Sequence, residues 1–122
     1  PNMVIGQPNF SQNTPNNTNT PTPAVNARGV AFSFGPGRTF RASMAFDGNG
    51  NLWVSDTGNN RVLRYSLTVL QAGANYPTAD QAVGQVSLTT VTQVTSNDPR
   101  NRNILLGPTG LTFDNQGRLY VA

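Results

Sequence analysis

Short apolar runs separated by polar turns dominate residues 44–55 (MAFDGNGNLWVS). The run 44–46 leads into DGNG, whose Asp-Gly and Asn-Gly pairs favour the positive φ angles of tight hairpin turns. In the next run the side chains alternate, so that Leu52 and Val54 share one face and Trp53 takes the other. This pattern predicts two antiparallel strands joined by a tight turn.

The same pattern continues through the following residues. DTGNN at 56–60 is a second turn signal, and RVLRYSL at 61–67 alternates as a third strand does. A loop is expected over 68–80, and the β-branched run at 81–94 (QAVGQVSLTTVTQV) is expected to supply a fourth strand. These elements together predict one four-stranded antiparallel sheet.

An internal repeat decides the fold class. Residues 44–55 align without a gap with LTFDNQGRLYVA at 111–122, which lies 67 positions later. A second echo pairs VIGQPNF at 4–10 with AVGQVSL at 82–88, 78 positions later. Repeated four-stranded antiparallel units are typical of β-propeller blades, which close their cores by packing on one another. The sequence therefore predicts an all-β protein with about one and a half blades of an incomplete ring.

The repeat also divides the chain into segments. Residues 11–27 are mostly Asn, Thr and Pro, which bury too little apolar surface to offset their ordering entropy, so a long surface loop is expected there. Pro1 stands where a Met would begin a complete chain, which favours a processed product or an excised piece. The predicted organisation is the last strand of a preceding blade at 1–10, a polar Asn/Thr/Pro-rich loop with an inserted segment at 11–43, one full blade at 44–90, an inter-blade loop at 91–110, and the first strands of the next blade at 111–122.

The composition narrows the chemistry that this chain can carry. All eight basic residues are Arg and all five acids are Asp, so the Lys and Glu that usually cover helices are absent. There is no Cys and no His, which excludes disulfides, thiolate metal sites and Ser-His-Asp catalysis. The net charge of +3 is small and its arginines are dispersed, with only Arg100 and Arg102 close together. A nucleic-acid surface is therefore not expected, and no run is long and apolar enough to cross a bilayer.

The stretch MAFDGNGNLWVSDTGNNRVLRYS resembles the NHL repeat of β-propeller proteins, most closely the bacterial secreted and cell-surface kind. The resemblance covers nearly all of residues 44–122 and treats 1–10 as a blade tail, whereas 11–43 depart from it. It implies a structural role for the motif residues, which are Asp47, Gly50, Trp53, Val54, Asp56, Asn59, Arg61 and Val62, with Asp114 and Gly117 in the second copy.

Two turns are candidate sites with competing interpretations. In the turn 56–61, Asp56 can accept backbone N–H groups and Arg61 can reach a carboxylate, but the favoured interpretation is that they pin the hairpin and tie adjacent blades. The turn Asp47-Gly-Asn-Gly-Asn superficially resembles a calcium loop, yet no Glu is present to complete such a site. In the second copy a cation, Arg118, takes the last position, so a plain hairpin turn is favoured.

Two further sets of residues lie outside the repeated pattern. Arg38, Phe40 and Arg41 belong to the inserted segment and form the best candidate binding loop, because insertions on regular scaffolds often carry binding. Asn9 and Asn16 begin N-x-Ser/Thr sequences and are candidate glycosylation sites, although chance supplies such matches in an Asn-rich segment.

The resulting hypothesis is a non-enzymatic, extracellular or cell-surface β-propeller scaffold or binding module. Its expected partners are proteins, through self-association or adjacent blades, with glycans as a further class; no catalytic residue, cofactor, metal or nucleic-acid partner is expected. The alternative is a piece of a propeller enzyme, because propellers related to NHL repeats include metal-dependent lactonases and lyases. Its catalytic residues would then lie in other blades. Some NHL propellers bind RNA, which is the weakest of these alternatives because the arginines are dispersed and lysine is absent.

Overall fold

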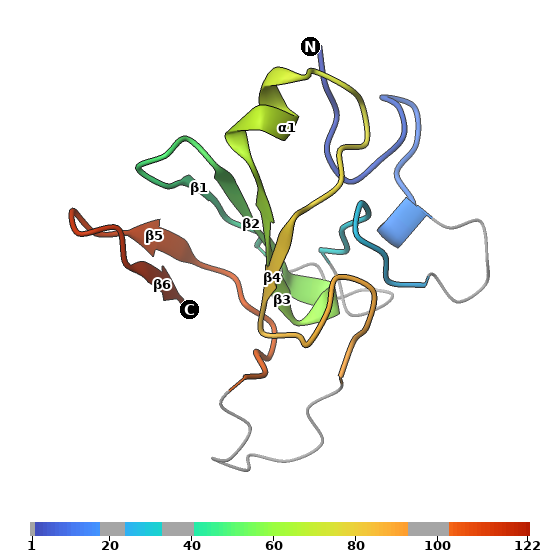
Figure 1. The fold of residues 1–122 in the computed structure, drawn as a ribbon. Coiled ribbons are helices and arrows are strands. Elements are labelled where there is room, and N and C mark those ends of the chain that lie inside the picture. The colour runs from blue at the N-terminus through green and yellow to red at the C-terminus, as the bar shows by residue number, and fades with distance from the viewer. Residues whose placement is uncertain (1, 18–23, 33–40, 93–102) are drawn as a thin grey trace.

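The computed structural model describes residues 2–17, 24–32, 41–92 and 103–122. It is built from two antiparallel β-sheets with little helix, which confirms the predicted all-β class (Figure 1). The larger sheet has four strands and the smaller has two, and the N-terminal segment runs beside the larger sheet (Figure 1).

The larger sheet follows the chain order. Its strands are β1 (Met44–Phe46), β2 (Leu52–Asp56), β3 (Arg61–Tyr65) and β4 (Gln81–Val83), each paired antiparallel with the next. The register places Leu52 opposite Tyr65 and Val54 opposite Leu63, so these four side chains share one face, as the alternation predicts.

The smaller sheet reproduces the first hairpin. Strands β5 (Leu111–Phe113) and β6 (Leu119–Val121) pair with Leu111 opposite Val121 and Phe113 opposite Leu119. Strands β1 and β2 pair in the same register 67 positions earlier. The turn glycines Gly50 and Gly117 have φ angles of 80° and 78°, which only glycine adopts without strain. The gap-free repeat in the sequence is therefore a repeat in backbone geometry.

Both faces of the larger sheet are used for packing. On one face a buried cluster joins the sheet to residues before and after it; its members are Val30, Leu52, Val54, Leu63, Tyr65 and Ala79. On the other face, Trp53 meets Phe113 of β5 edge to face, with ring centroids 5.8 Å apart. The second hairpin thus packs against the face of β1 and β2 that the N-terminal segment does not cover.

A second correspondence links the segments that precede each hairpin. Gly6 and Gly84 have positive φ angles of 82° and 89°, and the side chains of Val30 and Leu105 press on them so closely that a Cβ would collide. Such close packing explains why the sequence echo keeps glycine at this position.

Matching hydrogen bonds accompany the two glycines. Gln7 Nε2 donates to Thr14 O at 2.8 Å, and Gln85 Nε2 donates to Thr92 O at 3.4 Å. The 78-residue echo is thus also structural.

Three elements differ from the sequence expectations. A short helix, α1 (Leu67–Gln71), replaces part of the loop expected over 68–80, and Ser66 Oγ caps it by accepting from Val69 N at 3.3 Å. Strand β4 ends at Val83 instead of continuing along the β-branched run, because Gly84 turns the backbone. Residues 2–10 make only an isolated parallel bridge, between Gly6 and Gly29, where a strand was expected.

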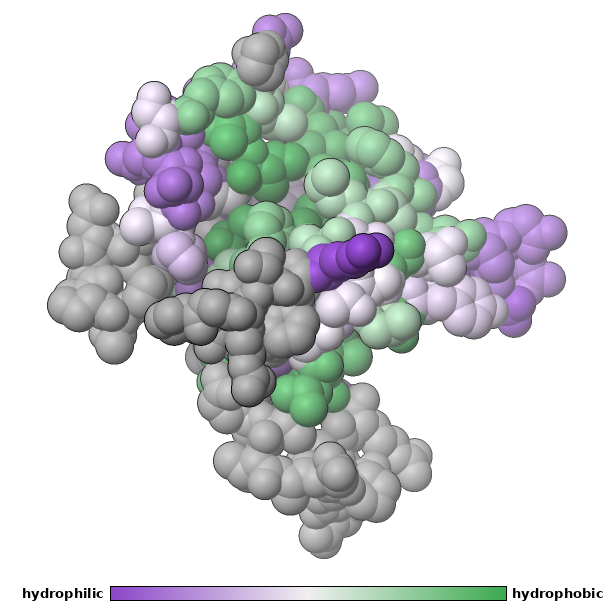
Figure 2. Space-filling view, turned by 180° about the vertical axis from the view of Figure 1, so that it is seen from behind, coloured by the Kyte–Doolittle hydropathy of each residue, from purple (hydrophilic) through white to green (hydrophobic). Residues whose placement is uncertain are grey.

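The segment expected as a long surface loop is partly buried. A 3-10 turn, η1 (Pro15–Asn17), brings Asn16 against the sheet, where it is only 4 % exposed. Seen from behind, hydrophobic residues gather across the middle of the molecule, and most hydrophilic residues lie toward its margins (Figure 2). None of the helices in the described ranges has the length and apolar character that a membrane span requires.

Candidate functional site

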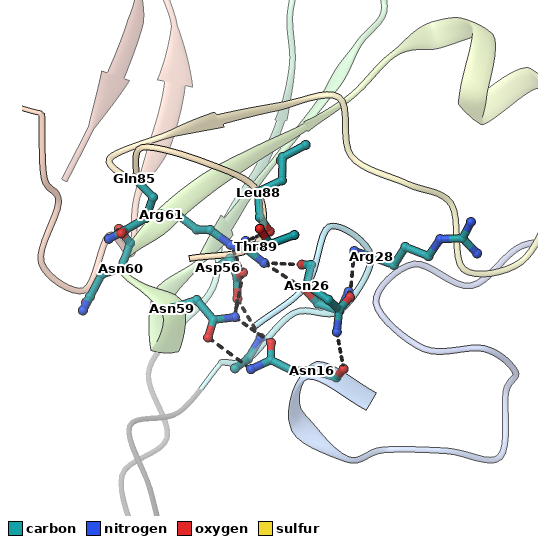
Figure 3. Close-up of polar contacts among 12 residues, drawn as sticks. Asn16, Asn26, Arg28, Asp56, Asn59, Asn60, Arg61, Gln85, Leu88 and Thr89 are labelled. Atoms are coloured by element: carbon teal, nitrogen blue, oxygen red, sulfur yellow. Dashed lines mark hydrogen bonds and ion pairs between the residues drawn. The ribbon is translucent and has the colours of Figure 1, made fainter. Parts of the chain in front are cut away.

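The turn between β2 and β3 forms a buried polar network that we call the junction: residues 56–61 with the groups that they bind (Figure 3). Its central side chains are Asp56, Asn59 and Arg61. Both Asp56 and Arg61 have no exposed surface, and Arg61 Nε donates to Asp56 Oδ2 at 2.6 Å. Asn59 Nδ2 reaches the two oxygens of the same carboxylate at 2.9 and 2.8 Å. The turn therefore carries its own ion pair and a bridging amide.

The local backbone places these side chains. Residues Thr57–Asn59 form the 3-10 turn η2, and Asn60 ends it in the left-handed region with φ 54° and ψ 40°. Asn tolerates this conformation better than most residues. Because Asp56 and Arg61 are directly opposite each other in the β2–β3 register, the turn holds their side chains at hydrogen-bond distance.

The junction binds the N-terminal segment at several points (Figure 3). The backbone N–H of Ala31 donates to Asp56 Oδ1 at 2.6 Å. Arg61 Nη2 donates to the carbonyls of Asn26 and Gly29 at 2.9 and 3.2 Å. These contacts span 25 to 35 positions of sequence, so the turn fixes a segment that precedes the sheet.

Asn16 completes this side of the junction. Its Oδ1 accepts from Asn59 Nδ2 at 2.7 Å, and its Nδ2 donates to Asn59 Oδ1 at 3.2 Å. The two amides thus form a reciprocal pair in a buried site, which satisfies both polar groups of each side chain.

The junction also binds the chain that follows the sheet. Arg61 Nη1 donates to Leu88 O at 2.7 Å, and Thr57 Oγ1 donates to Pro108 O at 2.7 Å. Asn60 Oδ1 accepts from Gly107 N at 2.9 Å, immediately before the second hairpin. One turn therefore ties together the segment before the first sheet, that sheet, and the connection to the next hairpin.

Burial raises the pKa of Asp56 above its usual value, while the charge of Arg61 and the hydrogen bonds from Ala31, Asn59 and Arg61 oppose that shift. The Arg61 guanidinium donates hydrogen bonds to one carboxylate and three backbone carbonyls. Because both side chains of the Asp56–Arg61 pair are fully buried, neither can contact a substrate. The pair therefore acts as a structural cross-link and not as a catalytic acid or nucleophile.

The turn of the first hairpin uses its aspartate in the same local way. Asp47 Oδ1 accepts from the backbone N–H groups of Asn49 and Asn51, and Oδ2 accepts from Asn51 Nδ2 and Trp53 Nε1. Although partial burial acts in the opposite direction, these bonds lower the pKa of Asp47 to about 2.

Asp114 repeats this arrangement with different partners. Its Oδ1 accepts from the N–H groups of Gln116 and Arg118, and its Oδ2 accepts from Arg118 Nε and Tyr120 Oη. Both carboxylates are directed at their own turns, which leaves little for a calcium ion to coordinate. Within the described ranges no cluster of three or more Asp, Glu, His or Cys could hold a metal ion.

The remaining predicted residues are not gathered into a site. Arg38 and Phe40 of the candidate binding loop lie outside the described residues, as do Arg100 and Arg102, and Arg41 is exposed.

The two candidate glycosylation sites differ in their surroundings. Asn9 is exposed, and its Oδ1 accepts from Ser11 N. Asn16 Nδ2, the atom that a glycan would join, donates to Asn59, so a glycan on Asn16 and the junction exclude one another.

Sequence reasoning missed three members of the network, namely Asn16, Asn26 and Gln85. Gln85 Nε2 donates to Asn60 O at 3.1 Å, and its Oε1 accepts from Thr92 N at 2.6 Å. The 78-residue echo contains this glutamine and its counterpart Gln7, which is the signal that could have identified it. Asn16 and Asn26 have no such signal, since they sit in a segment where asparagine is common.

Comparison with known proteins gave no match: no family model, no curated protein and no solved structure is significantly similar to this chain. The resemblance to NHL repeats therefore rests on the motif residues alone.

Proposed function

We propose that this chain is a non-enzymatic scaffold and binding module of the β-propeller type, in which each four-stranded unit is a blade of the NHL kind. The observation that carries the proposal is the junction, because a single buried turn binds the segments before and after its sheet. A repeat protein needs such links between units, since no unit can bury both of its faces alone.

The chemistry of the described residues also supports a scaffold. The acidic groups in both hairpin turns and in the junction are occupied by local donors, which leaves none of them directed at a shared cleft. Function on such a scaffold depends on surfaces that contact other molecules and not on the repeat itself.

The proposed location is extracellular or at the cell surface, with proteins as the main partners and assembly with other copies or blades as the main activity. The Asn- and Thr-rich composition, with few charged residues and neither Lys nor Glu, supports a polar surface suited to that location. Asn9 is the exposed candidate for carrying a glycan.

The test is the native mass of the chain, measured by light scattering and native mass spectrometry over a range of concentrations. The expected result is a defined oligomer or filament built from the 13.0 kDa chain. A folded chain that stays monomeric at every concentration would overturn assembly with other copies. Turnover of lactone substrates by the purified chain would overturn the non-enzymatic role.

A further inference from the structure

Arg28 and Arg64 each lie over an aromatic ring. The Cζ atom of Arg64 is 5.8 Å from the ring centroid of Trp53, and that of Arg28 is 5.7 Å from the ring centroid of Tyr76. Arg64 also binds Asp80, whose two carboxylate oxygens accept from Nε and Nη2 at 3.0 and 3.1 Å. A stacked arginine on this molecule therefore presents its two-pronged donor edge to a carboxylate.

Arg28 has the aromatic stack without the carboxylate. The ion pairs between described residues use Arg61, Arg64 and Arg118, and none of them includes Arg28. Its side chain is exposed and extends away from the junction (Figure 3). The guanidinium is thus placed on a ring with its donors accessible to a molecule from solution.

This guanidinium lines a surface pocket with a volume of about 280 Å³, which we call the Arg28 pocket. The other walls are Val69 of α1, the helix C-cap Ala72, and residues 74–78. Apolar side chains with a few polar groups are typical of small-molecule sites, and this volume lies at the lower end of their range. The Arg28 pocket therefore suits a ligand with one ring and one negative charge.

The backbone under the stack is strained. Tyr76 has a φ angle of 58°, which bulky residues rarely adopt. It is held there by two contacts with the N-terminal segment, since its N–H donates to Val4 O at 2.9 Å and its Oη donates to Asn26 Oδ1 at 3.3 Å. The same Asn26 oxygen accepts from Arg28 N at 2.9 Å, so one side chain positions both members of the stack. Strained residues of this kind are concentrated at ligand-binding positions.

Two further polar groups are available beside the guanidinium. Asn75 Oδ1 accepts from Val4 N at 3.0 Å, and the Nδ2 of the same amide has no acceptor among the described residues. Thr78 is exposed, and its hydroxyl makes no hydrogen bond to another described residue. The Arg28 pocket thus offers an amide donor and a hydroxyl to a polar ligand.

We infer that the Arg28 pocket binds an acidic sugar, namely a hexuronate residue of a glycan. The sugar carboxylate binds Arg28 as Asp80 binds Arg64. The C–H face of the sugar ring packs on the apolar wall, and Asn75 and Thr78 bind its hydroxyl groups. The inference rests on the proposed binding role and deepens it, because it names a class of partner and the site that receives it.

A peptide carboxylate is the competing occupant. Peptides are held largely through their backbone, by a strand edge, a groove or a nest of N–H groups. In the Arg28 pocket the Tyr76 N–H is already bound to Val4 O, and the groups that remain available are side-chain groups. Side-chain amides and hydroxyls suit the hydroxyl groups of a sugar better than a peptide backbone.

The probe is sodium glucuronate, titrated into the full chain at pH 7 and followed by isothermal titration calorimetry. Glucose is the control for the carboxylate, because it has the ring alone. Acetate is the control for the ring, because it has the carboxylate alone, and N-acetylalanine represents a peptide terminus. Shifts of the backbone amide signals of residues 74–78 in NMR spectra locate the binding.

Three protein variants test the residues. Arg28→Gln removes the charge from an exposed side chain, and Arg118→Gln makes the same change at another exposed arginine, in the second hairpin. Tyr76→Asn removes the ring that supports the guanidinium but keeps a residue that tolerates a positive φ angle. Each variant is first checked for an unchanged circular dichroism spectrum.

The expected result is saturable glucuronate binding with a Kd of about 1 mM, as a ligand of this size allows. Arg28→Gln and Tyr76→Asn should each weaken it about tenfold or more, and Arg118→Gln should leave it unchanged. Absence of binding to the folded chain, equal binding of glucose, or an unchanged Kd in Arg28→Gln would each overturn the inference. Equal or tighter binding of N-acetylalanine or acetate would refute the sugar as the ligand.

Native mass separates this inference from the proposed assembly. An oligomer that binds no glucuronate leaves the scaffold role standing and refutes the Arg28 pocket as a sugar site. A stable monomer that binds glucuronate through Arg28 supports the pocket and refutes assembly with other copies.

Discussion

The two hairpins, β1–β2 and β5–β6, have the same register and the same turn, yet their surroundings differ. Strand β2 lies between β1 and β3 and is buried along its whole length. Within the part of the chain that the structure describes, β6 pairs with β5 alone, and its central residue, Tyr120, is exposed. The local sequence is therefore sufficient for the hairpin, and the burial of that hairpin depends on the segments that pack around it.

The same comparison holds for two ion pairs. Arg61 and Asp56 are joined at 2.6 Å with no exposed surface, and Arg118 and Asp114 are joined at the same distance with the arginine 65 % exposed. The same Nε–Oδ2 distance thus occurs in two solvent environments. The difference in burial, and not the contact distance, is expected to decide what each pair contributes to stability.

The largest effect is expected from replacing the buried arginine. Arg61→Met leaves the Asp56 carboxylate buried without its counter-charge and three backbone carbonyls without their donor. Removal of one partner from a buried pair costs about 3–5 kcal/mol, which is a large part of the stability of a small domain. Urea unfolding followed by Trp53 fluorescence measures the loss.

Arg118→Met is the control for that variant, because it removes the same interaction from an exposed site. Its expected cost is about 0–1 kcal/mol. Equal losses in the two variants would contradict a special role for the junction. A third variant, Asp56→Leu combined with Arg61→Met, should recover part of the lost stability, because it removes the unpaired charge.

A smaller loss of stability is expected when either of two equivalent leucines, one in each hairpin, is truncated to alanine. Leu52 and Leu119 occupy the same register position in the two hairpins, but Leu52 is buried in the main cluster and Leu119 is half-buried. Leu52→Ala should cost about 2–5 kcal/mol, because it leaves a cavity in the cluster.

Leu119→Ala is expected to cost less than half of that amount, since less of its surface is removed from water. Thermal unfolding of both variants under the same conditions gives the comparison. A Leu119→Ala loss that equals the Leu52→Ala loss would show that another molecule covers β6 in solution, which light scattering on the same samples would detect.

Much of the first unit could be predicted from its sequence. The alternation around Trp53 and the Gly50 turn are local signals, and they predicted β1, β2 and β3 with the correct faces. The triad of Asp56, Asn59 and Arg61 was also identifiable, because its members lie within six positions of one another.

The partners of that triad could not be found in the same way. Asn16 contacts Asn59 across 43 positions, and Asn26 contacts Arg61 across 35, through atoms that any asparagine or backbone supplies. Helix α1 was missed because it has only five residues and includes the β-branched Thr68 and Val69, whose helix propensity is low. Side-chain packing from Leu105 on Gly84, next to the end of β4, is equally invisible in a local pattern.

The smallest expected effect is the pH dependence of stability that the two turn aspartates, Asp47 and Asp114, contribute. Asp47 has a folded-state pKa of about 2, below the ordinary value of 3.8, so it binds its proton less tightly in the folded state than in the unfolded state. Its contribution is therefore fully present above about pH 4 and is lost as the pH falls toward about 2. Allowing for solvent screening, we expect about 1 kcal/mol from Asp47.

Asp47→Asn should remove this contribution, because an amide has one acceptor oxygen where the carboxylate has two. It therefore cannot serve both the backbone N–H groups that bind Oδ1 and the side-chain donors that bind Oδ2. Urea unfolding at several pH values between about 5 and 2 should show the parent and the variant converging as the pH falls. The hydrogen bonds from Arg118 also lower the pKa of Asp114, but this turn is open to solvent, which weakens their contribution to stability. The difference in unfolding free energy between Asp114→Asn and the parent should therefore be smaller than that for Asp47→Asn, and it should also shrink as the pH falls. A gap between the parent and Asp47→Asn that stays constant down to about pH 2 would mean that the turn is held by its backbone geometry alone, with Gly50 and not the carboxylate as its main determinant.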